Sequence, residues 1–148
     1  MSKTHIVGVK GRRVWDSRGW PTVEVDVTLK CGAMGRAIAP AGASRGRAEA
    51  VDLRDGEEAF GGLDVTQAIS GIDGEISSAL LGLDGMEQVD VDDTLISLDG
   101  TPDKARLGGN ATVAVSMAVA HASAAAQGVP LWQYLGGTNA GPMPLPEI

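Results

Sequence analysis

A run of strictly alternating polar and apolar residues, TVEVDVTL at positions 22–29, constrains the fold more than any other feature of this chain. In an extended strand successive side chains point to opposite faces, so the two kinds of residue separate. One face carries Val23, Val25, Val27 and Leu29, and the other carries Thr22, Glu24, Asp26 and Thr28. The alternation predicts a strand that is buried on its apolar face and solvated on its polar face.

The segments on either side predict two further strands. Residues 5–15 have a weaker strand pattern, and residues 33–39 have a third. The stretch 16–21 predicts the first connecting turn, in which Gly19 is free to adopt a positive φ, and Gly32 predicts the second. Three consecutive strands with short connections indicate an antiparallel meander.

Helical spacing replaces alternation after residue 46. The predicted helices are, in chain order, 48–55, 65–82, a segment from Val89 to the Asp-Gly-Thr-Pro stretch at 99–102, 108–127 and 129–137. Asp64 with Gln67, and Asp84 with Glu87, have capping-box spacing at the starts of the second and third of these. The Ala-rich segment 108–127 is apolar almost all round, which predicts a helix buried between neighbours. Strands followed by helices indicate an α+β fold, with a three-stranded antiparallel meander and a helical bundle packed on one face of it.

The composition excludes several classes of protein. The chain has 148 residues, of which 43% are hydrophobic and 21% charged, a balance typical of a single soluble domain. Three Trp, one Tyr and one Phe leave the core to aliphatic side chains. A net charge of −7 argues against nucleic-acid binding. A single cysteine, Cys31, excludes an internal disulfide, and no apolar run approaches the roughly 20 residues that span a bilayer, so we expect a cytoplasmic protein without membrane contact.

Individual residues predict little chemistry by pattern alone. His5 and His121 are most simply packed or rim residues, and the acidic residues of 84–103 predict a solvated helix face. The basic residues near the N-terminus are most simply solvated at strand edges. The loop APAGASRG, residues 39–46, differs, because it holds no side chain larger than serine before Arg45 and lies between a predicted strand and a predicted helix. Such loops on a rigid frame often carry binding or catalytic residues.

Five segments, taken in order along the chain, closely resemble the N-terminal domain of enolases. They are DSRGWPTVEVD (16–26), PAGASRGRAEA (40–50), LRDG (53–56), LDGTPDKARLGGNA (98–111) and PLWQYLGG (130–137). Each segment alone is a weak signal. Five collinear segments with the family's spacing make the whole chain similar to that domain.

The resemblance implies a fold, an activity and partners. Enolases interconvert 2-phosphoglycerate and phosphoenolpyruvate in glycolysis with two Mg²⁺ ions, and their N-terminal α+β domain caps a C-terminal barrel. By this likeness residues 1–140 form the capping domain, and the Pro-rich residues 141–148 lead toward a barrel beyond this chain. The implied partners are the substrate of the complete enzyme, the barrel domain and, in the full-length form, further copies of the enzyme.

The resemblance also assigns site residues. The 39–46 loop becomes a lid over the barrel mouth, formed by Gly42, Ala43, Ser44, Arg45 and Gly46, and the oxygens of Ser44 bind the second Mg²⁺. The small residues let the backbone approach the ligand closely. No catalytic residue falls in this chain, because the family's base lysine, its acid partner and the carboxylate ligands of the first metal belong to the barrel. We therefore expect the chain alone to be inactive.

Two more expectations concern association and substrate. In the family the residues matching Arg18 and Glu24 form ion pairs across the dimer interface, largely with the partner's barrel domain. The fragment alone is therefore expected to be mainly monomeric or to dimerise only weakly. Trp20, Ala41, Arg45 and Glu147 replace an Asn, a Ser, a Thr and an apolar residue of the family pattern, which leaves the exact substrate open. Arg45 either contacts a substrate phosphate or replaces threonine at a solvated position. The alternatives to an enolase capping domain are a free-standing, non-catalytic interaction module of the same fold and the capping domain of an enolase-like enzyme for another carboxylate.

Overall fold

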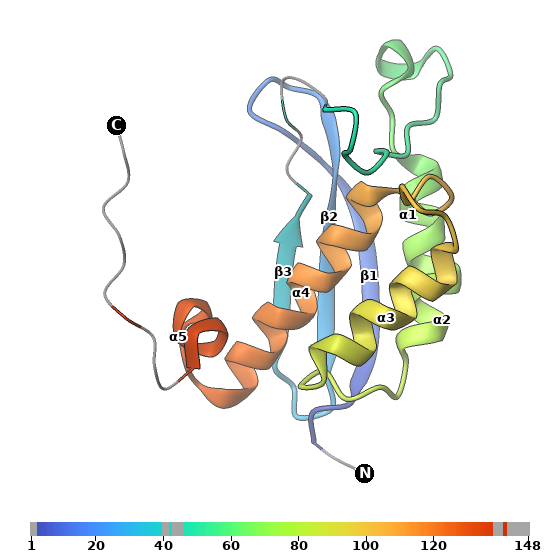
Figure 1. The fold of residues 1–148 in the computed structure, drawn as a ribbon. Coiled ribbons are helices and arrows are strands. Elements are labelled where there is room, and N and C mark those ends of the chain that lie inside the picture. Colours follow the sequence, from blue (N-terminus) through green and yellow to red (C-terminus); the bar gives the residue numbers. More distant parts are fainter. Residues whose placement is uncertain (1–2, 40–41, 43–45, 138–140, 142–148) are drawn as a thin grey trace.

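The computed structural model describes residues 3–39, 42, 46–137 and 141 (Figure 1). Its sheet consists of β1 (Ile6–Trp15), β2 (Pro21–Leu29) and β3 (Met34–Ile38), antiparallel and in the order β1-β2-β3. Gly19 and Gly32, in the two connecting turns, have φ angles of +75° and +89°, a region that glycine adopts without steric cost. The predicted meander is confirmed.

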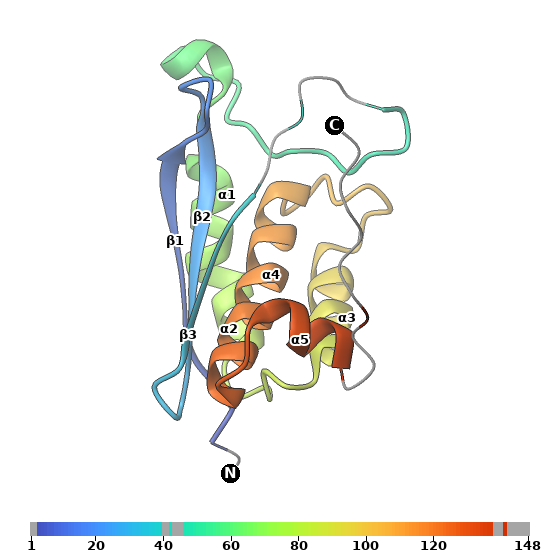
Figure 2. The ribbon, with the colours of Figure 1, turned by 90° about the vertical axis from the view of Figure 1, so that its left-hand side faces the viewer.

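Helices cover one face of this sheet (Figure 2). They are η1 (Ala59–Gly62), α1 (Thr66–Gly71), η2 (Ile72–Ile76), α2 (Ser77–Leu80), α3 (Gln88–Asp99), α4 (Gly109–Gln127) and α5 (Leu131–Gly136). α1, η2 and α2 follow one another without a break, and η2 is a π-helical turn. α1 and α2 pack on β1, whereas α4 packs on β2 and β3. The predicted α+β class is confirmed, and no helix in the described part of the chain is long and apolar enough to cross a membrane.

The core is aliphatic, as the composition predicts. The sheet contributes the apolar face of β2, and the helices contribute small and branched side chains from α1 to α2 and from α4. Its fully buried members include Val23, Val25, Val27, Leu29, Ile72, Ile76, Leu80, Val115, Ala118, Val119 and Ala122. Trp15, Trp20, Phe60 and Trp132 are all at least 46% exposed, so the aromatic side chains are left to the surface.

A glycine brings α4 into backbone contact with β3. A Cβ atom placed on Gly35 would lie 2.1 Å from the Ala118 carbonyl oxygen and 2.2 Å from the Ala122 nitrogen. These distances are far below van der Waals contact, and both neighbours are helix backbone atoms that cannot rotate away. Only glycine at position 35, facing small residues on α4, allows this helix to lie so close to the sheet.

The helix predicted for residues 48–55 is wrong. Residues 47–49 form a turn, and residues 50–55 have no regular secondary structure. The backbone of this segment bonds to distant parts of the chain instead: the Val51 N–H donates to the Asp103 carbonyl over 2.8 Å, and the Val51 carbonyl accepts from the Gly109 N–H over 2.7 Å. Those bonds replace the i to i−4 bonds that a helix needs.

Both predicted capping boxes are also wrong. The Asp64 carboxylate accepts from Arg13 and from the adjacent Val65 N–H. Asp55 caps α1 in its place, because its carboxylate accepts from the Thr66 and Gln67 N–H groups at 3.0 Å each. Burial by itself would raise the pKa of Asp55. These bonds and the one from the Thr66 hydroxyl together lower the pKa by more than that, so the net shift is downward. At the start of α3 no side chain forms a capping bond; the Asp84 carboxylate accepts from the Met86 N–H instead.

α4 is less enclosed than predicted. Its sheet-facing residues are buried, but Val113 and Met117 on its outer face are 44% and 39% exposed. Within the described residues the helix is thus covered by the sheet on one side and by α3 beside it, and it keeps one apolar face open.

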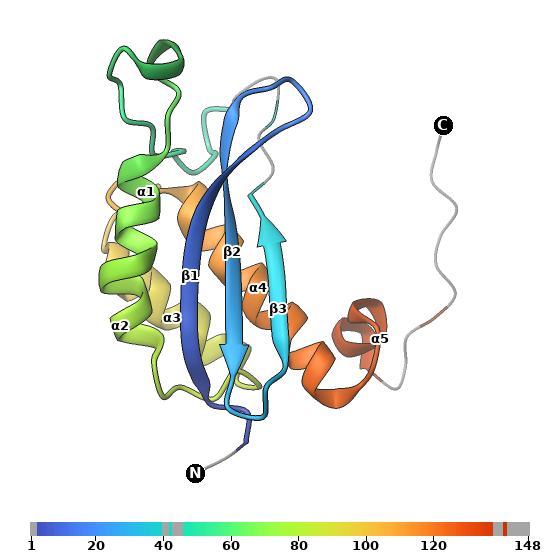
Figure 3. The same ribbon diagram turned by 180° about the vertical axis from the view of Figure 1, so that it is seen from behind.

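Figure 3 shows the face of the sheet that the helices leave open. Two carboxylates of β2 that alternate with its core valines are nevertheless less exposed than the alternation predicts. Glu24 and Asp26, on the central strand, are each only 9% exposed. Arg12 from β1 forms ion pairs with both carboxylates, and the Arg36 Nε from β3 lies 2.6 Å from Asp26 Oδ1 and 3.6 Å from Glu24 Oε2. The predicted solvated strand face is wrong for these two residues, because the arginines of the flanking strands cover them. The hydrogen bonds from Arg36, and after them those from Arg12, lower the pKa of Asp26 to about 2 although burial opposes the shift.

Replacement of Gly35 by alanine tests the close packing of α4. Because the new methyl group meets helix backbone, we expect Gly35→Ala to lower the free energy of unfolding by about 3 kcal/mol or more. Gly74→Ala is the matched control: Gly74 lies within the helical stretch with open space around it. It should stabilise the chain by about 0.5–1 kcal/mol. Equal thermal melts for the two variants would contradict this account of the sheet–helix contact.

Acid titration tests the ion-pair network. The folded-state pKa of Asp26 is about 2, whereas an unfolded aspartate titrates near about 3.9. The stabilisation is therefore complete above about pH 4 and is lost as the pH falls toward 2. We expect Asp26→Asn to cost about 1–2 kcal/mol at neutral pH, allowing for solvent around the exposed Arg36, and to cost progressively less below pH 4. Denaturant unfolding across this range, with exposed Asp93→Asn as control, measures the difference; a pH-independent cost would contradict the role of the carboxylate charge.

Candidate functional site

The 39–46 loop is the candidate site, and the structure shows how its two ends are held. The turn between β1 and β2, residues 46–56 and the first turn of α4 lie together at one end of the domain (Figure 2). Of the predicted lid residues, Gly42 and Gly46 are described and exposed. Ala43, Ser44 and Arg45 lie outside the described residues, so the assignment of Ser44 as a Mg²⁺ ligand stays a prediction.

The loop begins at a buried anchor, Ala39, which we call the N-terminal root. Ala39 is 2% exposed, and its N–H donates to the Val23 carbonyl over 2.8 Å, which extends the pairing of β3 with β2 by one residue. The Thr22 hydroxyl donates to the Ala39 carbonyl, also over 2.8 Å. Because both backbone groups of Ala39 are bonded to the central strand, the position at which the loop leaves the sheet is fixed.

Residues 50–53, which we call the C-terminal root, anchor the other end. Val51 bonds through its N–H to Asp103 and through its carbonyl to Gly109. Leu53 bonds at both backbone groups to one side chain: its N–H donates to Asn110 Oδ1 over 3.0 Å, and its carbonyl accepts from Asn110 Nδ2 over 3.1 Å. The root is therefore extended chain fixed against the first turn of α4.

Arg54 ties the C-terminal root to the rest of this end. Its Nη1 donates to the Pro21 carbonyl at 2.5 Å and to the Leu63 carbonyl at 2.8 Å, and its Nη2 lies 3.4 Å from Asp52. One guanidinium thereby joins the start of β2 to the segment that enters α1. The side chain of Arg54 is only 14% exposed, so these bonds are largely shielded from water.

The turn between β1 and β2 contacts the loop through Arg18. The Asp16 carboxylate accepts from the Trp20 and Arg18 N–H groups and from the Arg18 guanidinium. The bond from Trp20 is the main cause that lowers the pKa of Asp16. The Arg18 guanidinium also lies 4.6 Å from the centre of the Trp20 ring and donates to the Gly42 carbonyl over 3.3 Å. The turn is thus linked directly to the loop.

The two residues predicted for a dimer interface are not brought together. Arg18 lies in the turn, engaged with Asp16, Trp20 and Gly42, whereas Glu24 lies in the middle of β2 and pairs with Arg12. Their role between subunits stays a prediction. Glu24 alternates in β2 with the core residues Val23 and Val25, so its side chain lies on the opposite face of the sheet. No helix of the described chain covers that face (Figure 3).

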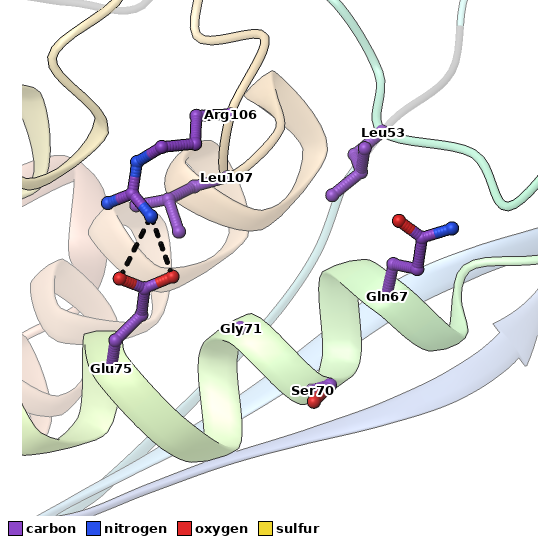
Figure 4. A pocket seen from close by; sticks show the side chains of 7 residues that line it. All are labelled: Leu53, Gln67, Ser70, Gly71, Glu75, Arg106 and Leu107. Atoms are coloured by element: carbon purple, nitrogen blue, oxygen red, sulfur yellow. Dashed lines mark hydrogen bonds and ion pairs between the residues drawn. The ribbon is translucent and has the colours of Figure 1, made fainter.

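A pocket of about 410 Å³ lies beside the C-terminal root (Figure 4). Leu53 and Gln67 line one side, and Arg106 and Glu75 form a two-bond ion pair on the other, with distances of 2.9 and 3.0 Å. The remaining Arg106 nitrogens donate to the Asp99 and Leu98 carbonyls. All of its nitrogens therefore bond within the chain, so this pocket offers no unpaired cation to an anionic ligand.

The segment between α3 and α4 is held by a buried carboxylate. Asp99 is 3% exposed and accepts from the N–H groups of Thr101 and Leu107 at 2.9 and 2.7 Å. Burial by itself would raise the pKa of Asp99. These bonds and the one from the Thr101 hydroxyl together lower the pKa by more than that, so the net shift is downward. The predicted solvated acidic face is therefore wrong for Asp99, which orders the segment that leads to Gly108 and α4.

The donor set for Mg²⁺ is incomplete in the described residues. They contain no group of three or more His, Cys, Asp or Glu side chains that could hold a metal ion. Mg²⁺ takes six oxygen ligands, and the hydroxyl and carbonyl of one serine supply at most two. The loop fits a role as one contributor to a Mg²⁺ site, and the other donors have to come from substrate, water or another domain.

The residues that anchor the loop were missed by sequence reasoning. Arg54 and Asn110 fall within the LRDG and LGGNA stretches, which drew attention only as parts of a family likeness. Their partners, the Pro21 and Leu53 carbonyls, are backbone groups distant in the chain, so no local pattern identifies them.

Comparison with known proteins agrees with this arrangement of fold and loop. The family model for the enolase N-terminal domain matches residues 6–135. Enolase 2 of Pseudomonas syringae pv. syringae (strain B728a) is 53% identical over 145 residues, which cover 97% of this chain. Enolase 2 of Pseudomonas syringae pv. tomato (strain ATCC BAA-871 / DC3000) is 52% identical over the same share.

The chain is thus an α+β domain with a loop that is anchored at both ends. The chain belongs to the enolase N-terminal domain family. It spans about a third of the length of these curated relatives, since the matched residues make up 34% of each.

Proposed function

We propose that this chain is the capping part of an enolase-type lyase that interconverts 2-phosphoglycerate and phosphoenolpyruvate in the glycolysis of the cytoplasm. The observation that carries the proposal is the PAGASRG loop itself, held at Ala39 and at residues 50–53 by backbone bonds while its described glycines stay exposed. A loop fixed at both roots can present small polar groups to a ligand without a large apolar anchor of its own.

In this proposal Ser44 contributes oxygen donors to one of two Mg²⁺ ions. When bound, Mg²⁺ supplies positive charge that stabilises the doubly charged carboxylate of the reaction. The chain's own part is to place Ser44 and to cover the site, which excludes water. Acid–base groups belong to the barrel domain, toward which residues 141–148 lead.

Arg18 and Glu24 remain our proposal for the contact between subunits of the complete enzyme. The uncovered sheet face that carries Glu24 supports it, because the partly exposed guanidinium groups of Arg12 and Arg36 lie there and can meet a partner's charges. Without a barrel the partner charges are missing, and we expect the isolated chain to scatter light as a monomer at micromolar concentration. A tight dimer would show that the sheet has an interface of its own.

A chimera tests the proposed activity. Residues 1–148 would replace the matching first third of Enolase 2 of Pseudomonas syringae pv. syringae (strain B728a), which supplies the remainder. We expect the chimera to form phosphoenolpyruvate from 2-phosphoglycerate in the presence of Mg²⁺, followed by the ultraviolet absorbance of the product. The isolated chain and the isolated remainder, assayed as controls, should show no turnover. A folded but inactive chimera would refute the enolase assignment in favour of another carboxylate or a non-catalytic role.

Within that chimera, Ser44→Ala should separate function from stability. Removal of one hard oxygen donor that acts in the transition state lowers turnover by roughly 10²-fold, the lower end of the usual range because the backbone carbonyl remains. The Mg²⁺ concentration for half-maximal rate should rise. Thermal stability should change by no more than about 0.5 kcal/mol, as for Ser70→Ala, an exposed serine on α1 used as control. Unchanged kinetics would remove Ser44 from the site.

A further inference from the structure

Two glycines at the start of α4 leave room for the C-terminal root. A Cβ atom on Gly108 would lie 2.6 Å from the Leu53 Cβ and 2.3 Å from Asn110 Oδ1, and Gly108 has a φ of +96°. A Cβ atom on Gly109 would lie 2.8 Å from the Ala50 Cβ. Two successive glycines therefore leave a space that residues 50–53 fill.

Asn110 acts in this space as a strand partner would. It is 4% exposed, and its side-chain amide accepts from the Leu53 N–H and donates to the Leu53 carbonyl. One residue along, the Gly109 N–H donates to the Val51 carbonyl. The root is thus bonded at alternate residues, as in a β-ladder, but its last pair of bonds comes from a side chain 57 residues away in sequence.

An amide is the group that suits this position. Leu53 presents one donor and one acceptor, and only a group with both can satisfy them together. A carboxylate lacks the donor and would face the Leu53 carbonyl with a like partial charge, whereas alanine would leave two backbone groups without partners in a largely buried place.

We propose that Asn110, presented by Gly108 and Gly109, is the positioning residue that fixes the C-terminal root of the 39–46 loop. The proposal rests on the function proposed above for that loop. Asn110 acts through Leu53, which it bonds at both backbone groups, while Gly109 beside it bonds Val51. Its effect on the reaction is to hold residues 50–53, which follow the loop, in one position.

Hydrogen exchange on the 148-residue chain tests the anchoring without any assay of activity. We expect Asn110→Ala to accelerate exchange of the Val51 and Leu53 amides by about tenfold relative to the amides of β2. Ser123→Ala is the matched control, because Ser123 is a fully buried polar residue of the same helix whose hydroxyl donates to the Gly85 carbonyl over 2.6 Å. It should lower global stability without singling out residues 51–53.

Asn110→Asp is a second variant in case alanine prevents folding. Its charged form lacks the donor, whereas the protonated carboxyl has both donor and acceptor, so the protection of Leu53 relative to β2 should recover as the pH falls through the pKa of that carboxyl. If residue 110 only filled space, the protection of Leu53 would not recover at low pH. Exchange that rises equally in residues 51–53 and β2 in both Asn110 variants would overturn the proposal.

Kinetics of the chimera test the consequence for the reaction. We expect Asn110→Ala to lower kcat/KM by about tenfold or more, with Ser123→Ala close to the parent chimera. Selective loss of protection with unchanged kinetics in an active chimera would overturn the positioning role. An inactive parent chimera would instead refute the proposed function, and the exchange data would still decide whether Asn110 holds the root.

Discussion

The contact between Gly35 and α4 is the constraint on which the rest of the domain depends. Because the Ala118 carbonyl and the Ala122 nitrogen occupy the space of a side chain at position 35, α4 can lie this close to β3 only with glycine there. Because α4 runs without a break from Gly109 to Gln127, a position fixed at Ala118 also determines where its first turn lies, toward the other end of the domain (Figure 1).

That first turn organises the candidate site. Gly108 and Gly109 receive the C-terminal root of the 39–46 loop, while the N-terminal root continues β3 at Ala39. The packing of α4 on β3 therefore determines the positions of both roots. The N-terminal root is fixed through β3, and the C-terminal root is fixed through α4. A change that moves α4 relative to β3 would therefore alter the distance between the two ends of the loop.

The parts of the fold with regular local patterns were predicted correctly. The alternation at 22–29, the turns at Gly19 and Gly32 and the Ala-rich stretch that became α4 all match the structure. The wrong predictions concern charged and polar side chains that bond to residues distant in the sequence. Asp55 rather than Asp64 caps α1, and Glu24 is buried because Arg12 crosses from the next strand. The candidate loop was recognised from its small residues and its family likeness, but the side chains that hold it were not.

The sequence by itself determined the order and kind of the main strands and helices, because their periodicity and turn residues act over a few neighbouring positions. It also determined the family, through the order of its segments. Only the tertiary structure decided that residues 50–53 are extended chain on α4 rather than a helix. A short isolated helix is marginal in water. The backbone groups of residues 50–53 bond instead to Asp103, Gly109 and Asn110, which lie next to them only in the folded domain.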